Sequence, residues 1–143
     1  MSAGPHCSML LVEDDPVDLD LILRALAPHI ESDGIGIARD GEQVLAWVEH
    51  WEHGTHPPPQ LILLDLKLPG IGGLEVLRRL RGSEPGRLIP VVVLTSSDEP
   101  RDIQAAYDLG ANSYIVKPIN YERFLEGLHQ INRYWCRTNR PPS

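Results

Sequence analysis

A run of four aliphatic residues that ends in a carboxylate restricts the fold more than any other feature of this chain. Residues 61–64 are Leu-Ile-Leu-Leu, and Asp65 follows directly. An uninterrupted apolar run of this length is typical of a strand that is buried on both faces of a parallel sheet. Open parallel sheets place their chemistry at the carboxyl ends of their strands, so Asp65 lies where a functional residue is expected.

A second run has the same design. Residues 9–12 are Met-Leu-Leu-Val, and Glu13, Asp14 and Asp15 follow. Two buried strands would therefore deliver four carboxylates to one edge of the sheet. Carboxylate oxygens are the ligands that a hard cation such as Mg2+ prefers, and the two runs together predict a magnesium-assisted acidic site.

Strand and helix patterns alternate along the rest of the chain. The expected strands are 8–13, 35–38, 61–65, 90–94 and 112–116, and the expected helices are 17–26 (with Pro16 in the first turn), 40–51, 73–81, 98–109 and 120–135. Five such repeats predict an α/β fold with a parallel sheet covered by helices on both faces. Short right-handed connections favour the flavodoxin-like (βα)5 fold with strand order 2-1-3-4-5. This order makes the first and third strands neighbours, which brings Asp14 close to Asp65.

Bulk properties exclude several classes of protein. The formal net charge of -7 over 143 residues argues against non-specific binding to nucleic acid and against an anionic membrane surface. No apolar run approaches the roughly 20 residues of a membrane span, and the first residues do not resemble a secretory signal. Cys7 and Cys136 leave a structural disulfide open, but free thiols in a reducing cytoplasm are favoured.

Four strand ends carry informative residues. They are Glu13-Asp14-Asp15, Asp65, Thr95-Ser96 and Lys117-Pro118. Each motif alone is common, but the four in this order resemble the receiver domain of two-component response regulators (CheY-like proteins). The resemblance covers about residues 8–135, which leaves 1–7 and 136–143 as flexible tails and no output domain.

The resemblance implies a magnesium site around the nucleophile. Asp65 would be the phosphoacceptor and would bind Mg2+ together with Asp14 and the backbone carbonyl of Lys67. Glu13 would act through a water molecule or by orienting these ligands. In many receivers the residue two positions after the nucleophile is asparagine or another short or neutral side chain, so Lys67 departs from the common pattern.

The resemblance also implies how phosphate is sensed. Lys117 and the Thr95 hydroxyl would contact the phosphoryl group, and a cis peptide bond before Pro118 would aim the lysine inward. Thr95 would be coupled to Tyr114 on the fifth strand. Phosphorylation would then remodel the surface formed by the fourth helix, the fifth strand and the fifth helix.

The implied function is that of a single-domain response regulator. A sensor histidine kinase would transfer a phosphoryl group to Asp65, docking near Pro16, Val17 and Leu21 and the loop Pro118-Ile119. The domain would catalyse this transfer and its own dephosphorylation, so it is not an enzyme in the usual sense. Two alternatives are an interaction scaffold that has lost phosphorylation and an aspartyl-phosphate phosphatase. The phosphatase would need an aspartate where Lys67 stands.

The last predicted helix carries a candidate contact surface. Phe124, Leu128, Ile131 and Trp135 recur at helical spacing, with Tyr134 beside them. Aromatic residues at the end of a helix often mark a contact, so this region is expected to form a homodimer. The segments Leu-Val-Glu-Asp-Asp, Val-Val-Leu-Thr-Ser-Ser and Tyr-Asp-Leu-Gly-Ala-Asn-Ser-Tyr, with the Tyr-Trp helix end, resemble stand-alone receivers paired with phytochrome-type histidine kinases. Those proteins tend to dimerise through this region.

Other polar residues have structural interpretations. Asp15 is expected to cap the first helix, and either Ser97 or Asp98 the fourth. A histidine-rich segment could suggest zinc, but a solvated helix end at the opposite edge of the sheet is favoured. Its members are His50, His53 and His56, with Glu49 and Glu52 nearby.

Overall fold

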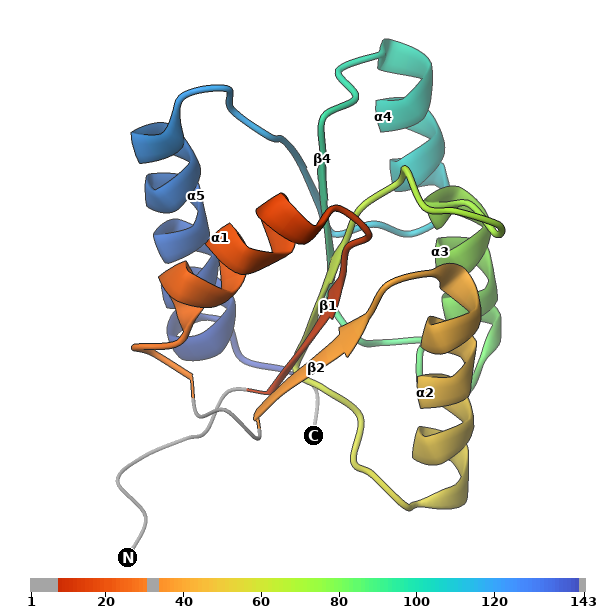
Figure 1. The fold of residues 1–143 in the computed structure, drawn as a ribbon. Helices are drawn as coiled ribbons and strands as arrows, with labels where there is room; N and C mark the ends of the chain where they lie inside the picture. The colour runs from red at the N-terminus through yellow and green to blue at the C-terminus, as the bar shows by residue number, and fades with distance from the viewer. Residues whose placement is uncertain (1–7, 31–33, 142–143) are drawn as a thin grey trace, which may run out of the picture.

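The computed structural model describes residues 8–30 and 34–141, and these residues form a five-stranded parallel sheet between two layers of helices (Figure 1). The strands are β1 (Met9–Val12), β2 (Ile35–Ala38), β3 (Leu61–Leu64), β4 (Val91–Thr95) and β5 (Ser113–Val116). Their order across the sheet is β2-β1-β3-β4-β5, and every pairing is parallel. The predicted flavodoxin-like fold is therefore confirmed.

Helices cover both faces of this sheet. They are α1 (Pro16–Leu26), α2 (Gly41–His53), α3 (Gly73–Gly82), α4 (Pro100–Asp108) and α5 (Tyr121–Arg133). Helices α1 and α5 cover one face, and α2, α3 and α4 cover the other (Figure 1). The last helix runs further than expected, because a π-helical turn, η2 (Tyr134–Thr138), extends it past Trp135.

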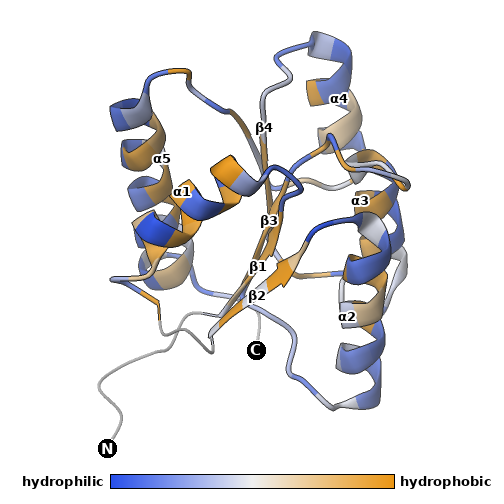
Figure 2. Cartoon of the chain, viewed as in Figure 1, coloured by the Kyte–Doolittle hydropathy of each residue, from blue (hydrophilic) through white to orange (hydrophobic). Residues whose placement is uncertain are grey.

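The central strands are buried on both sides. Along β1, Met9 and Leu11 pack with α1 and α5, while Leu10 and Val12 pack on the opposite face. Figure 2 shows apolar strands between helices whose outer faces are hydrophilic. This two-sided burial explains why the strands are continuous apolar runs without alternation.

Three residues of the expected contact surface lie in the core. Phe124, Leu128 and Ile131 are only 6%, 1% and 4% exposed, and they pack in the layer shared with α1. Their assignment to a dimer surface was wrong, because the apolar stripe of α5 faces the sheet. Tyr134 is 49% exposed, and Trp135 is partly buried against the same core.

The predicted cap of α1 is confirmed, whereas the predicted cap of α4 is not. The Asp15 carboxylate accepts hydrogen bonds from the backbone N–H of Val17 (2.8 Å) and of Asp18 (3.2 Å), so its capping role is confirmed. Helix α4 instead follows Glu99, with no capping side chain. The prediction for that helix was wrong, because the Ser97 hydroxyl donates to the Asp102 carboxylate (2.5 Å) inside the first turn.

The expectation of free thiols was also wrong. Cys136 is disulfide-bonded, and Cys7 lies outside the described residues. Within residues 8–30 and 34–141, no helix is long and apolar enough to cross a membrane.

The histidine-rich segment forms an aromatic cluster. The rings of His50 and His56 lie 5.0 Å apart between centroids, and both contact Trp47. In the part of the chain that the structure describes, no three His, Cys, Asp or Glu side chains are arranged to hold a metal ion. The zinc interpretation therefore has no support here.

Candidate functional site

The parallel register of β1 and β3 builds the acidic site. Val12 pairs with Leu64, so the next residues, Glu13 and Asp65, leave the sheet side by side. The backbone N–H of Asp65 donates to the Val12 carbonyl (3.0 Å), which continues this pairing one residue beyond the strand. Both side chains are buried, with residue exposures of 2% for Glu13 and 6% for Asp65.

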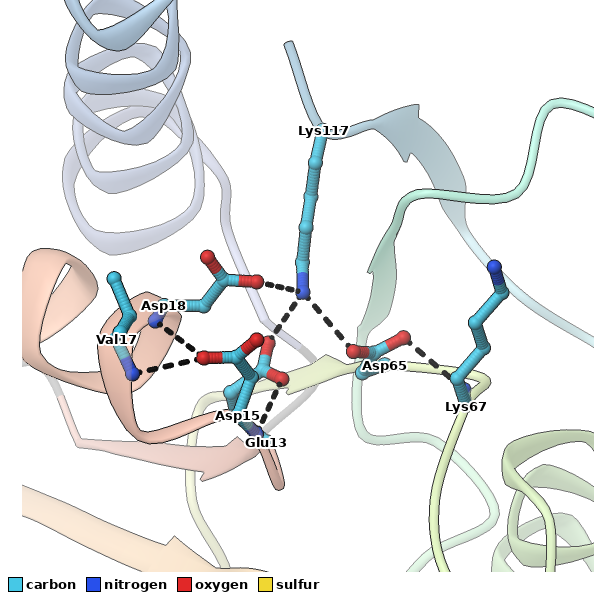
Figure 3. A network of polar contacts seen from close by, with 7 residues as sticks. All are labelled: Glu13, Asp15, Val17, Asp18, Asp65, Lys67 and Lys117. Atoms are coloured by element: carbon cyan, nitrogen blue, oxygen red, sulfur yellow. Dashed lines mark hydrogen bonds and ion pairs between the residues drawn. The ribbon is translucent and has the colours of Figure 1, made fainter. Parts of the chain in front are cut away.

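The ammonium group of Lys117 lies among three carboxylates. Its Nζ is 2.7 Å from Glu13 Oε1, 2.7 Å from Asp18 Oδ2 and 3.0 Å from Asp65 Oδ2 (Figure 3). The fifth strand supplies this lysine just beyond its last residue, where the Lys117 N–H donates to the Thr95 carbonyl (2.7 Å). The fold thus brings together residues that are 52 to 104 positions apart in the chain.

Asp18 was not identified from the sequence. It lies in the first turn of α1, and the Asp15 cap holds its backbone N–H, which places its side chain at the same edge of the sheet. A first-turn acid is ordinarily explained by the helix dipole, so its type carried no special signal. The position of Asp18 was informative, because a helix that follows a parallel strand begins at the carboxyl edge of the sheet. Lys117 lies at the same edge.

The two buried acids of the site, Glu13 and Asp65, have pKa values that are shifted in opposite directions. Burial raises the pKa of Glu13 to about 7, against the opposing hydrogen bond from Lys117. Burial also pushes the pKa of Asp65 upward, but the backbone N–H of Lys67 and the charge of Lys117 outweigh it, so that pKa falls below 3.8. Asp65 is therefore anionic at neutral pH and can act as a nucleophile or a cation ligand.

Lys117 remains positively charged in this setting. Burial lowers the pKa of its ammonium, but the hydrogen bonds to Asp18 and Glu13 and the charge of Asp65 more than offset this, and the net shift is upward. A permanent cation therefore lies 3.0 Å from an Asp65 oxygen. Such a cation can stabilise negative charge that builds up on a group bound to that oxygen.

Thr95 places an unused hydroxyl in the interior. The residue ends β4, is fully buried, and has no partner for its Oγ1 among the residues that the structure describes. A buried polar group without a hydrogen bond costs about 1–3 kcal/mol. An acceptor that arrived within reach of Thr95 would remove that penalty.

Tyr114 connects β5 to the loop that precedes α4. Its phenolic hydroxyl donates to the Ser97 carbonyl (2.9 Å), and the Ser97 hydroxyl in turn donates to Asp102 on α4. The tyrosine is part-buried. A movement at the end of β4 therefore has a direct hydrogen-bonded route to α4.

The remaining expected metal ligands lie at the same edge. Asp14 is exposed there, and the Lys67 N–H donates to Asp65 Oδ1 (3.1 Å) while its side chain extends away from Lys117 (Figure 3). In this arrangement Glu13 and Asp65 both contact the ammonium group of Lys117. The available donors are carboxylate and carbonyl oxygens, the chemistry that suits a hard divalent cation.

The peptide bond before Pro118 differs from the expectation. Residues 8–30 and 34–141 contain no cis peptide bond, so Lys117–Pro118 is trans. The expectation of a cis bond was wrong. Lys117 reaches the carboxylates with the trans bond.

Comparisons with known proteins agree with this geometry. The family model of the response regulator receiver domain matches residues 9–129. The response regulator Rcp1 of Synechocystis sp. (strain ATCC 27184 / PCC 6803 / Kazusa) is 35% identical over 137 residues, which cover 95% of this chain and 93% of Rcp1. The probable methanogenesis regulatory protein FilR2 of Methanothrix harundinacea (strain 6Ac) is 40% identical over 134 residues, covering 94% of this chain and 86% of FilR2.

Solved structures show the same likeness. The phosphorylated cyanobacterial phytochrome response regulator RcpA matches with a TM-score of 0.87 and 37% identity, covering 96% of this chain and 99% of that one. The Mn2+-bound form of Rcp1 matches with a TM-score of 0.85 over the same shares. The chain therefore belongs to the response regulator receiver family.

Proposed function

We propose that this protein is a single-domain response regulator that accepts a phosphoryl group from a histidine kinase on Asp65. The observation that carries the proposal is the position of Lys117, whose ammonium group contacts the anionic Asp65 at 3.0 Å. The buried, unpartnered hydroxyl of Thr95 supports it. The chain also covers 93% of Rcp1, a response regulator of similar length.

The proposed reaction is a phosphoryl transfer between two side chains. An Asp65 oxygen forms a bond to phosphorus while the phosphorus–nitrogen bond of the donor phosphohistidine breaks, and the electron pair of that bond returns to the imidazole. Lys117 and the Thr95 hydroxyl donate hydrogen bonds to the phosphoryl oxygens. Water later hydrolyses the acyl phosphate, so the protein resets itself without being a conventional enzyme.

Mg2+ is the proposed cofactor. Asp14, Asp65 and the backbone carbonyl of Lys67 would hold it, with Glu13 supporting them. When bound, it would neutralise charge between the attacking carboxylate and the phosphoryl oxygens. The all-oxygen donor set supports this assignment, as does the metal-bound form of the similar protein Rcp1.

The proposed output is a change at the surface formed by α4, β5 and α5. A phosphoryl group on Asp65 would attract the Thr95 hydroxyl and shift the end of β4. The Tyr114–Ser97–Asp102 hydrogen bonds would carry that shift to α4. The switch is thus a two-state equilibrium that one added anion biases.

The proposed partner is a phytochrome-type histidine kinase, by similarity to RcpA. It would dock beside Asp65 on Pro16, Val17, Leu21 and the Pro118-Ile119 loop. Val17 and Ile119 are apolar yet 66% and 105% exposed, which supports a contact surface there. The protein would work in the cytoplasm, as a homodimer that uses Tyr134 and Trp135.

Acetyl phosphate provides a direct test of the phosphoacceptor. The protein is incubated with acetyl phosphate and Mg2+ and then weighed intact by mass spectrometry. The expected result is a gain of one phosphoryl group that hydroxylamine removes and that Asp65→Asn abolishes. Asp20→Asn, which removes an exposed carboxylate of α1, serves as the matched control and should retain the gain. Persistence of the label in Asp65→Asn would refute the proposal.

The proposed kinase class needs a separate test. Purified phytochrome-type kinases and kinases of other classes are autophosphorylated and then mixed with the protein for short times. Transfer should be fastest from a phytochrome-type kinase. Faster transfer from an unrelated class would contradict the partner assignment while leaving the receiver function intact.

A further inference from the structure

Lys117 uses its full hydrogen-bonding capacity in the unphosphorylated protein. An ammonium group has three N–H donors and no acceptor. Its three partners are Glu13 Oε1, Asp18 Oδ2 and Asp65 Oδ2, all within 3.0 Å. To bind an oxygen of a phosphoryl group, Lys117 must therefore give up one of these carboxylates.

The three partners differ in how readily they can be released. The side chains of Glu13 and Asp65 are 3% and 7% exposed, whereas that of Asp18 is 26% exposed. Before the reaction Asp65 carries its charge at the buried site and Glu13 is buried beside it, so separating either of them from Lys117 costs more than separating Asp18. Asp18 can instead turn toward water, where its charge also lies near the backbone N–H groups that begin α1.

We propose that Asp18 is a positioning residue that holds Lys117 before phosphorylation and releases it to the phosphoryl group on Asp65. The inference rests on the proposed function. The Asp18 contact belongs to the unphosphorylated state, so it opposes phosphorylation. Removing it should leave Lys117 at the site, held by Glu13 and Asp65, with one N–H donor ready for the incoming group.

The first measurement is the initial rate of phosphorylation by acetyl phosphate at saturating Mg2+. Asp18→Ala should react about threefold faster or more, which corresponds to the loss of one competing hydrogen bond. Asp20→Ala removes an acid of the same helix that pairs with the exposed Arg24, and it should react at the unchanged rate. Equal or slower reaction of Asp18→Ala relative to Asp20→Ala overturns the proposal.

A second measurement tests whether a faster rate comes from the loss of the Asp18–Lys117 hydrogen bond or only from the removal of a negative charge. In the metal-free protein, hydrogen exchange of the Lys117 ammonium group is followed by nitrogen-detected NMR. Exchange should be faster in Asp18→Ala, because one donor then faces water, and unchanged in Asp20→Ala. A faster phosphorylation rate without faster exchange would assign the effect to charge alone and also overturn the proposal.

Two further controls keep the test decisive. If Asp18→Ala is poorly folded, Asp18→Leu replaces it, since leucine is close to aspartate in size and has no hydrogen-bond acceptor in its side chain. The unsubstituted chain and Asp65→Asn are run in parallel. Absence of a hydroxylamine-labile label in the unsubstituted chain refutes the phosphoacceptor function itself, and the role of Asp18 falls with it. A normal label with no Asp18 effect refutes only the role of Asp18.

Discussion

At the scale of single residues, Glu13 and Asp65 show how neighbouring carboxylates acquire different properties. Both follow buried strands and both contact Lys117. Asp65 also accepts the Lys67 backbone N–H, which favours its charged form, whereas burial dominates at Glu13. One acid is therefore fully ionised at neutral pH, and the other is close to its midpoint.

This difference predicts a pH dependence of stability. Because the pKa of Glu13 is raised from 4.5 to about 7, the folded state binds more protons than the unfolded state between these values, and stability falls as pH rises through this range. Glu13→Gln should remove the decline. Asp65 does not interfere, since its lowered pKa affects stability only as pH falls below about 4. The raised pKa of Lys117 acts only at alkaline pH.

The measurement is urea unfolding in EDTA at pH 5 and pH 8. The free energy of unfolding of the unsubstituted protein, relative to Glu13→Gln, should be lower at pH 8 than at pH 5. The same difference at both pH values would show that Glu13 does not titrate in this range.

At the scale of elements, Arg81 joins the end of α3 to two loops. Its guanidinium group donates to the carbonyl oxygens of Gly86, Ile89 and Gly110 and to the Asn112 side chain, over 2.7–3.1 Å. From the sequence it is one more charged residue in the last turn of an amphipathic helix. Its role depends on how α3 packs against the segments before β4 and β5.

Arg81→Ala should therefore destabilise the protein by about 2–4 kcal/mol, because the part-buried carbonyl oxygens of Gly86 and Ile89 lose their donor together with two exposed acceptors. Arg78→Ala is the matched control. Arg78 pairs with Glu75 on the exposed face of the same helix, where such a pair is worth about 0–1 kcal/mol. Chemical denaturation of both variants tests the difference, and similar losses for the two would show that Arg81 is an ordinary surface residue.

At the scale of the whole molecule, the structure narrows the proposed dimer contact to the end of α5 and η2. The apolar stripe of α5 is used within the monomer, so the contact depends on Tyr134, which is 49% exposed, and on the partly buried Trp135. Their rings form an edge-to-face pair with centroids 4.9 Å apart. A pair of this kind presents a rigid aromatic surface at little entropic cost.

Substitution at Tyr134 tests this contact. Tyr134→Ser should weaken dimerisation by about tenfold or more, as expected for a buried aromatic anchor. Tyr121→Ser, at the other end of α5 and 51% exposed, should leave it unchanged. Sedimentation equilibrium over a range of concentrations gives both dissociation constants. A Tyr134→Ser variant that dimerises like the unsubstituted protein would exclude this surface.

The strands and their order were predictable because their signals are local. Continuous apolar runs such as 61–64 mark strands buried on both faces, and alternation with helices implies a parallel sheet. A parallel sheet collects the carboxyl ends of its strands at one edge. For that reason the sequence alone indicated that Asp65, Thr95 and Lys117 belong together.

Only the tertiary structure decided how these residues pair and which faces are covered. Lys117 and Asp18 are 99 positions apart, and their contact depends on how α1 packs against the sheet. The burial of Phe124 and the hydrogen bonds of Arg81 to four other residues also depend on packing between segments that are distant in the chain. Periodicity shows that a helix has an apolar face, but packing across the chain determines what that face meets and which donor reaches which acceptor.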